Sequence, residues 1–290
     1  MKEITGKTKV VGVIGDPVEH SRSPQMHNAA FEALGLNYVY VPFHVPRGRI
    51  RQALEGLKAL GVVGINVTIP HKREALKFAD QSSEEAKLIG AANTLSFRDG
   101  KVIADNTDGR GFIEALRAIG VGDLAGKRAL VLGAGGASRA ICVALAREGV
   151  SGITVANRTI ERAEELAELI SENFDEVEVK SIPLEERFLA EEMALNDLLV
   201  NATSVGMKPS DPMLIHPEWL HSGLIVYDVV YTPPETKLVR AAKEKGLRCS
   251  GGIDMLVFQG AISFQIWTGV APPVEVMRAT LMRSLGVTYG

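Results

Sequence analysis

The chain has 290 residues and a formal net charge of −3. Its length suggests about two domains, and its charge gives no reason to expect a nucleic-acid or membrane-surface partner. No apolar run approaches the roughly 20 residues that cross a bilayer. The two cysteines, Cys142 and Cys249, form no CxxC or metal-ligand spacing. We therefore expect a cytoplasmic protein with free thiols in a reducing compartment and without a metal site.

The first part of the chain alternates between strand-like and helix-like segments. Continuous apolar, β-branched runs predict buried strands, and apolar residues three and four apart predict amphipathic helices. Pro24 suits the first position of a helix, and Ser23 suits its N-cap. The repeated order of strand and helix indicates a mostly parallel sheet with helices on its faces. The predicted strands are 10–14, 38–45 and 62–69, and the predicted helices are 24–34, 50–60 and 70–79.

Two strands at 91–97 and 101–104, joined by the turn 98–100, follow this part. The polar segment 105–109 is interpreted as the crossing to a second domain, residues 110–251, of the Rossmann kind. The remaining two helices are expected to pack back on the first domain. The predicted strands of the second domain are 129–132, 152–156, 177–181, 197–201, 224–229 and 247–250.

A glycine-rich segment, residues 133–140, lies between a strand and a helix of the second domain. Such glycines permit a tight turn and close approach of the backbone to a pyrophosphate, which the free N–H groups at the helix start then bind. Ser138 occupies the place of the third glycine or alanine of this pattern, so we expect slightly looser packing of helix on strand. The segment predicts a dinucleotide site.

The end of the next strand indicates which dinucleotide is bound. An acidic residue there would favour NAD, but the chain has Asn157, Arg158 and Thr159, with Arg162 one turn further on. Guanidinium groups bind a 2′-phosphate bidentately, so the segment favours NADP. The alternative is that both arginines are solvated helix residues and that Thr159 is a simple N-cap.

Two residues are candidates for catalysis. Lys72 lies in the first turn of a predicted helix, where the helix dipole disfavours a cation and eases the loss of a proton. Asp108 precedes another predicted helix. The alternatives are a solvated surface lysine and an N-capping aspartate. His27 and His71 lack the spacing of a zinc site or a catalytic triad, and we interpret them as surface or packing residues.

Four polar residues of the first domain are candidates for ligand binding. Ser21 has no capping role, whereas Ser23 has one. Asn66 and Thr68 alternate along an otherwise apolar strand and would point to the same face. Buried polar groups need partners, and at the carboxyl end of a parallel strand the usual partner is a ligand. The pattern therefore predicts a ligand site in the first domain.

Taken together, these motifs resemble the shikimate dehydrogenase family, in order and over nearly the whole chain. The resemblance implies an N-terminal substrate domain, residues 1–109 with 252–290, and an NADP-binding Rossmann domain, residues 110–251. The motifs that carry it are 21–24, 66–72, 90–94, 106–109, 133–139, 157–159, 201–204 and 255–259.

The resemblance also implies a role for individual residues. Lys72 and Asp108 match the catalytic pair, and no role is implied for Asp254. The positions that match shikimate-binding residues are Ser21, Ser23, Asn66, Thr68, Asn93, Tyr231 and Gln259. The positions that match NADP-binding residues are Gly133, Ala134, Gly135, Gly136, Ala137, Asn157, Arg158, Thr159, Arg162, Thr203 and Gly252.

The implied reaction is the NADP-dependent, reversible reduction of 3-dehydroshikimate to shikimate in the pathway to chorismate and the aromatic amino acids. The nearest alternative is a bifunctional quinate/shikimate dehydrogenase that uses NAD(P). The serine pair, Ser21 and Ser23, resembles the shikimate-specific form. Two further alternatives are a non-catalytic NADP-binding regulator and a folate-type dehydrogenase. The expected partner is the small-molecule substrate. The chain is expected to be a monomer or a homodimer.

Overall fold

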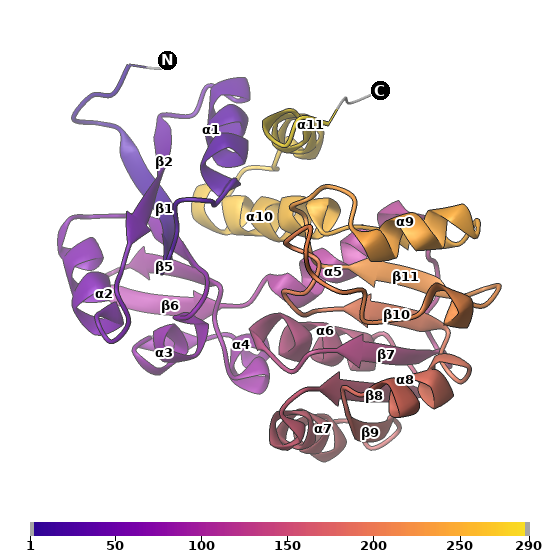
Figure 1. The fold of residues 1–290 in the computed structure, drawn as a ribbon. Helices are drawn as coiled ribbons and strands as arrows, with labels where there is room; N and C mark the ends of the chain where they lie inside the picture. The colour runs from indigo at the N-terminus through magenta and orange to yellow at the C-terminus, as the bar shows by residue number, and fades with distance from the viewer. Residues whose placement is uncertain (1–2, 288–290) are drawn as a thin grey trace. The chain divides into compact units, whose positions relative to one another are not determined.

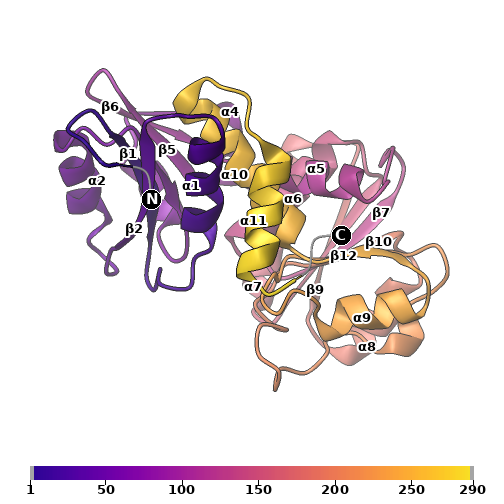
Figure 2. The same cartoon turned by 90° about the horizontal axis from the view of Figure 1, so that it is seen from above.

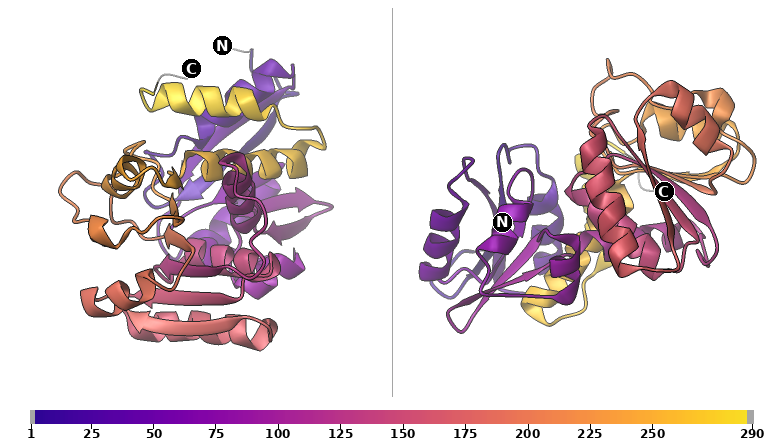
Figure 3. Two further views of the ribbon diagram at one scale, coloured as in Figure 1. Left: turned by 90° about the vertical axis from the view of Figure 1, so that its right-hand side faces the viewer. Right: turned by 90° about the horizontal axis from the view of Figure 1, so that it is seen from below.

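The structure is a computed structural model that describes residues 3–287 (Figure 1). It divides into two compact units, residues 1–111 with 257–290 and residues 112–256, each built around one six-stranded sheet. Figure 3 gives side and bottom views of the same ribbon. None of the helices in the described range is long and apolar enough to cross a membrane.

The first unit contains a mixed sheet with the order β2-β1-β3-β5-β6-β4. The strand β1 is parallel to β2 and β3, whereas β5 is antiparallel to both of its neighbours. The three parallel strands and the hairpin predicted from the sequence are confirmed. The hairpin turn has Asp99 and Gly100 at φ 50° and 71°, the left-handed conformation of a two-residue hairpin loop. The strands are β1 (Lys9–Gly15), β2 (Tyr38–His44), β3 (Gly64–Val67), β4 (Gln81–Ser82), β5 (Thr94–Arg98) and β6 (Lys101–Asp105).

The helices of the first unit begin slightly away from the predicted positions. The N-cap residue of α1 is Arg22, so the prediction of Ser23 as the cap was wrong; Ser23 is already helical. The helix α3 begins at Lys72, directly after its N-cap His71, and is only six residues long. A short strand and a short helix, β4 and α4, were not predicted. The helices are α1 (Ser23–Ala33), α2 (Ile50–Ala59), α3 (Lys72–Lys77) and α4 (Glu84–Ile89).

The second unit contains a fully parallel sheet with the order β12-β11-β10-β7-β8-β9. The strand order reverses between β7 and β10, which is the topological switch point of a Rossmann sheet, as predicted. The strands are β7 (Arg128–Leu132), β8 (Gly152–Asn157), β9 (Glu178–Pro183), β10 (Leu198–Asn201), β11 (Ile225–Asp228) and β12 (Arg248–Ser250). The helical segments are α5 (Asp108–Ala118), whose first turn belongs to the first unit, α6 (Gly136–Arg147), α7 (Ile160–Asn173), α8 (Glu186–Met193), η1 (Pro217–Trp219) and α9 (Lys237–Glu244).

The C-terminal helix α11 (Val274–Ser284) and most of α10 (Ile253–Thr268), from residue 257 on, belong to the first unit. The helix α11 packs along α1, beside which it lies in Figure 2. The indole of Trp267 on α10 donates a hydrogen bond of 3.0 Å to the backbone oxygen of Leu95 in β5. The core of the N-terminal sheet is therefore closed by segments from the other end of the chain.

The histidines His27 and His71 are packing residues, and the alternative of a surface position was wrong, because both are fully buried. The ring of His27 stacks on Tyr40 with ring centroids 4.4 Å apart, and burial lowers the pKa of this imidazole to about 3. The Nε2 atom of His71 lies 2.6 Å from the backbone oxygen of Val45, to which it donates.

The contact between β3 and α10 predicts that substitution of Gly64 lowers the stability of the fold. A methyl group at this position would collide with the indole of Trp267. We expect Gly64→Ala to lower the free energy of unfolding by about 1–3 kcal/mol, the usual cost of overpacking. The matched control is Gly56→Ala in α2, where a Cβ meets nothing within 4 Å and helix propensity improves by about 0.8–1 kcal/mol. Urea unfolding of both variants checks this, and equal stabilities would contradict it.

Candidate active site

The centre of the site in the first unit is an ion pair between Lys72 and Asp108. The Nζ atom of Lys72 lies 2.6 Å from Oδ2 of Asp108. The side chains retain only 19% and 8% of their accessible surface. Lys72 opens α3 and Asp108 opens α5, so the fold joins two segments that are far apart in the sequence. A lysine held by a carboxylate at a partly open position is suited to exchange a proton with a bound hydroxyl or carbonyl oxygen.

The carboxylate of Asp108 is oriented by Asn93, directly before β5. The Nδ2 atom of Asn93 donates to Oδ1 of Asp108 over 2.7 Å, which leaves Oδ2 for Lys72. The Oδ1 atom of Asn93 accepts from the backbone N–H of Thr107 at 2.8 Å. Asp108 does not act as a side-chain N-cap. Instead, the side chain of Asn106 accepts from the Asp108 N–H at 3.0 Å. The capping interpretation of Asp108 was therefore wrong.

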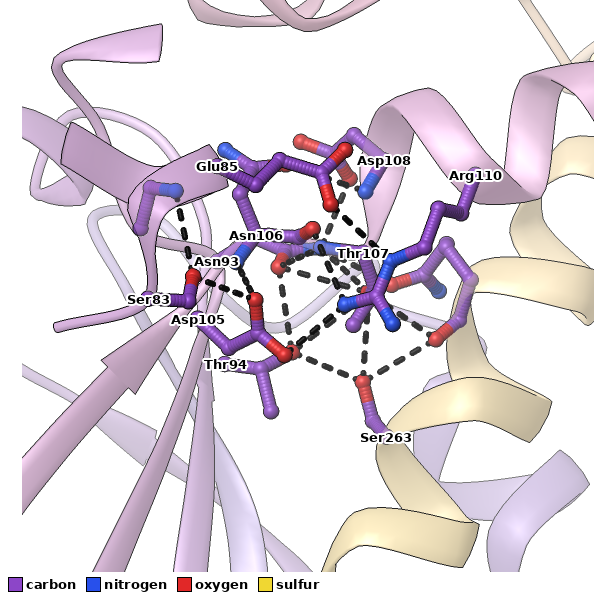
Figure 4. A network of polar contacts seen from close by, with 12 residues as sticks. Ser83, Glu85, Asn93, Thr94, Asp105, Asn106, Thr107, Asp108, Arg110 and Ser263 are labelled. Atoms are coloured by element: carbon purple, nitrogen blue, oxygen red, sulfur yellow. Dashed lines mark hydrogen bonds and ion pairs between the residues drawn. The ribbon is translucent and has the colours of Figure 1, made fainter. Parts of the chain in front are cut away.

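An outer layer of polar contacts holds the loop that carries Asp108 (Figure 4). The guanidinium of Arg110 binds Asp105 at 2.8 Å and Glu85 at 3.2 Å. The other oxygen of Asp105 accepts from the hydroxyl of Ser83 and from the N–H of Asn106, both at 2.7 Å. These contacts fix the backbone immediately before the catalytic candidate.

The predicted ligand-binding residues Asn66 and Thr68 occupy different surroundings. Asn66 is 7% exposed at the end of β3 and is hydrogen-bonded to protein groups, whereas Thr68 is half-buried just beyond the strand. Ser21 and Ser23 are adjacent, and the hydroxyl of Ser21 accepts from the N–H of Ser23 at 3.4 Å. Gln259 on α10 accepts from Asn93 at 3.3 Å, which joins it to the Asp108 cluster. The substrate roles of these residues, and that of Tyr231 after β11, stay predictions.

Several members of this network were missed in the sequence, above all Thr94, Thr107 and Ser263. The hydroxyl of Ser263 lies 2.7 Å from that of Thr94 and 3.3 Å from that of Thr107. The spacing of Ser263, four residues after Gln259 on one helix face, is the signal that would have found it. Among the residues that the structure describes, no group of three or more His, Cys, Asp or Glu side chains could hold a metal.

The glycine turn of the second unit connects β7 with α6. Gly133 has φ 104°, and a Cβ there would approach the backbone oxygen of Ala202 to 3.1 Å and the hydroxyl of Ser138 to 3.2 Å. Gly135 is the N-cap of α6 and provides no side-chain cap, so the first N–H groups of the helix, including those of Gly136 and Ala137, are left for an anion. This geometry fits a dinucleotide pyrophosphate. Ser138 is fully buried, and the looser packing expected there stays a prediction.

The end of β8 presents two cations to solvent. Arg158 and Arg162 are exposed, and within residues 3–287 neither guanidinium has an ion-pair partner. Asn157 bonds the backbone oxygen of Thr159 at 2.8 Å, and Thr159 is the N-cap of α7 without a capping side-chain bond. Nearby, the hydroxyl of Thr203 is bound to Asn201 at 2.7 Å. The roles of Ala134, Thr203 and Gly252 in cofactor binding stay predictions.

Replacing Arg158 with alanine is expected to raise the KM for NADP by about 10- to 100-fold. A charge-assisted hydrogen bond of a guanidinium contributes about 1.5–3 kcal/mol. The KM for NAD, which lacks the 2′-phosphate, is the internal control and should change less than twofold. Steady-state kinetics with both cofactors measure this. A similar rise in both KM values would show that Arg158 does not bind the 2′-phosphate.

A Rossmann sheet with a pyrophosphate turn, in a chain whose other unit holds a lysine–carboxylate pair, has the features of a nicotinamide-dependent oxidoreductase. Three family models match the chain: the shikimate dehydrogenase substrate binding domain at residues 13–95, shikimate / quinate 5-dehydrogenase at 115–216, and the shikimate 5′-dehydrogenase C-terminal domain at 252–282. The chain belongs to the shikimate/quinate dehydrogenase family.

Individual relatives agree with this assignment. A Methanopyrus kandleri protein named shikimate dehydrogenase (NADP(+)) is 48% identical over 97% of this chain and 98% of its own. A crystal structure of a shikimate dehydrogenase in complex with NADP+ is 43% identical with a TM-score of 0.91, covering 98% of both chains. A Corynebacterium glutamicum quinate dehydrogenase in complex with NAD is 32% identical with a TM-score of 0.87, covering 95% of this chain and 99% of its own.

Proposed function

We propose that the protein catalyses the reversible, NADP-dependent reduction of 3-dehydroshikimate to shikimate, a step towards chorismate and the aromatic amino acids. The observation that carries the proposal is the 2.6 Å pair of Lys72 and Asp108, held by Asn93 in a unit that matches the shikimate dehydrogenase substrate domain. The relatives named as NADP-dependent shikimate dehydrogenases, one of them matched over 97% of the chain, support the same activity.

When bound at the glycine turn, NADPH supplies the hydride for the ketone carbon of the substrate. The charge that develops on the ketone oxygen needs a hydrogen-bond donor. Lys72 is proposed to donate to this oxygen and to transfer a proton to it, while Asp108 holds the ammonium in position. In the direction of shikimate oxidation the same pair takes up the hydroxyl proton. Ser21, Ser23, Asn66, Thr68, Asn93, Gln259 and Tyr231 are proposed to bind the carboxylate and the remaining hydroxyls.

The backbone at Gly133–136 and the exposed cations Arg158 and Arg162 are proposed to bind the pyrophosphate and the 2′-phosphate, respectively. The positive φ of Gly133 and the absence of a capping side chain on α6 support the first assignment. A cytoplasmic location and a monomeric or homodimeric state are further proposals, the first supported by the two free cysteines, Cys142 and Cys249.

The alternative function is oxidation of quinate with NAD, because a quinate dehydrogenase with bound NAD is among the similar structures. One assay separates the two: reduction of the nicotinamide, followed by its absorbance, with shikimate and NADP and then with quinate and NAD. We expect shikimate with NADP to give the higher kcat/KM. A higher kcat/KM with quinate and NAD would refute the proposal, and tight NADPH binding without oxidation of either alcohol would indicate a regulator.

A further inference from the structure

The side-chain amide of Asn66 is held from both ends by buried protein groups. Its oxygen Oδ1 accepts a hydrogen bond of 2.8 Å from the hydroxyl of Tyr40. Its nitrogen Nδ2 has three acceptors in reach: the backbone oxygen of Asn93 at 3.1 Å, the hydroxyl of Thr94 at 3.2 Å and the hydroxyl of Ser263 at 3.0 Å. The orientation of the amide is thus determined on both sides.

A count of hydrogen-bonding capacity shows what this amide can still offer to a ligand. The nitrogen has two hydrogens, and three acceptors already surround it, so no donor remains. The oxygen has two lone pairs and uses one for Tyr40, so one acceptor position is left. Asn66 is therefore able to accept a hydrogen bond from a ligand hydroxyl and unable to donate one to a carbonyl or ether oxygen.

Tyr40 is itself rigid, which is what a positioning residue requires. Its backbone N–H and oxygen are both bound by the side chain of Asn28, at 2.8 and 2.9 Å. Its ring is stacked on that of His27, with centroids 4.4 Å and planes 4° apart, and the tilted ring of Trp267 lies 6.2 Å away. With 2% of its surface exposed, Tyr40 does not reach a ligand and acts only through the groups it touches.

The hydroxyl of Tyr40 also interacts with Ser23 at the start of α1. Burial raises the pKa of Tyr40 well above its usual value, and a hydrogen bond with the Ser23 side chain opposes this rise. The phenol therefore stays neutral and keeps its proton for Asn66.

We propose that Tyr40 is a positioning residue that fixes the amide of Asn66 with its carbonyl oxygen towards the substrate, so that the site selects a hydroxyl at this point. The inference rests on the proposed function, since it assigns Asn66 to one of the two shikimate hydroxyls that are not oxidised. It adds a buried tyrosine outside the set of residues predicted from the sequence.

The test is Tyr40→Phe, which removes one oxygen and keeps the ring in its stack. We expect the KM for shikimate to rise about tenfold, which corresponds to about 1.4 kcal/mol, with kcat within threefold and the KM for NADP unchanged. The matched control is Tyr38→Phe, two residues earlier on β2, whose hydroxyl has no hydrogen bond within the described residues. This control should behave like the unaltered protein.

Two substrate analogues, each lacking one of the two hydroxyls that are not oxidised, separate positioning from a merely structural effect. In the unaltered protein, one analogue should lose about tenfold in kcat/KM relative to shikimate. In Tyr40→Phe that penalty should shrink to about twofold, because the amide acceptor is no longer aimed at the missing hydroxyl. An undiminished penalty, an unchanged KM for shikimate, or an equal rise in the KM for NADP would overturn the inference.

If Tyr40→Phe does not fold, a second variant tests how the amide nitrogen of Asn66 is held. Ser263→Ala combined with Thr94→Val leaves the amide nitrogen a single acceptor, the backbone oxygen of Asn93, for its two hydrogens. We expect the KM for shikimate to rise about threefold, and an unchanged KM would overturn the inference. A different result would refute the proposed function: an unaltered protein that does not reduce NADP with shikimate. An active unaltered protein with unaffected variants refutes the positioning role alone.

Discussion

Replacing Lys72 with alanine is expected to lower kcat for shikimate oxidation by about 100- to 10,000-fold, the usual contribution of a general acid–base group. The ammonium lies 2.6 Å from Asp108 and is the only cation that the described structure pairs with that carboxylate. Binding of shikimate should persist, because Asn66, Asn93 and the serine pair are left in place. Steady-state kinetics and direct titration with shikimate measure the two effects separately.

The matched control is Lys77→Ala at the other end of the same helix, α3. Lys77 is exposed and has no part in the network around Asp108, so its loss should leave kcat within twofold. Circular dichroism of both variants should match that of the unaltered protein. If Lys72→Ala turned over shikimate at the rate of the control, Lys72 would have no role in proton transfer.

The order of the elements could be predicted from the sequence because it depends on local signals. The β-branched runs and the turn at 98–100 predicted the parallel strands and the hairpin, and the alternating strands and helices around the glycine turn at Gly133 predicted a Rossmann sheet. The exact starts of helices could not be predicted. The helix α1 begins at Ser23, one residue earlier than predicted. The side chain of Asp108 is bound by Asn93 instead of capping its helix. Capping preference alone predicts neither outcome.

The candidate site was predictable as a set of residues but not as a network. Separate local signals indicate Lys72 and Asp108, and nothing local in the sequence indicates that Asn93 binds one oxygen of the Asp108 carboxylate and leaves the other for Lys72. Tyr40 and Ser263 were missed for the same reason. Each is buried and contacts Asn66 from a segment distant in the chain, and each looks like an ordinary core or helix residue in one sequence.

The layers of this network have different functions. Arg110 and Asp105 hold the backbone before α5, Asn93 turns the carboxylate, and Asp108 positions the lysine. Loss of an outer member should act through the inner ones, so its effects should be smaller and should not add to those of the catalytic pair. The largest effects are therefore expected at Lys72 and at the carboxylate that binds it.

Replacing Asp108 with asparagine is expected to lower kcat by about 100- to 1,000-fold with little change in the fold. Both carboxylate oxygens are acceptors, one for Asn93 at 2.7 Å and one for Lys72 at 2.6 Å. An amide offers only one acceptor. If its oxygen faces Asn93, its NH₂ group faces the ammonium of Lys72, and the reverse orientation sets two NH₂ groups against each other.

The control is Asp99→Asn in the hairpin turn, where the left-handed backbone favours asparagine and activity should not change. The double variant of Lys72→Ala with Asp108→Asn should be about as slow as Lys72→Ala alone, because a carboxylate that acts by positioning the lysine has no function once the lysine is absent. Independent, multiplying losses would instead mean that Asp108 contacts the reacting oxygen and moves a proton itself. The ratio of kcat in the double variant to kcat in Lys72→Ala thus identifies which member of the pair transfers the proton.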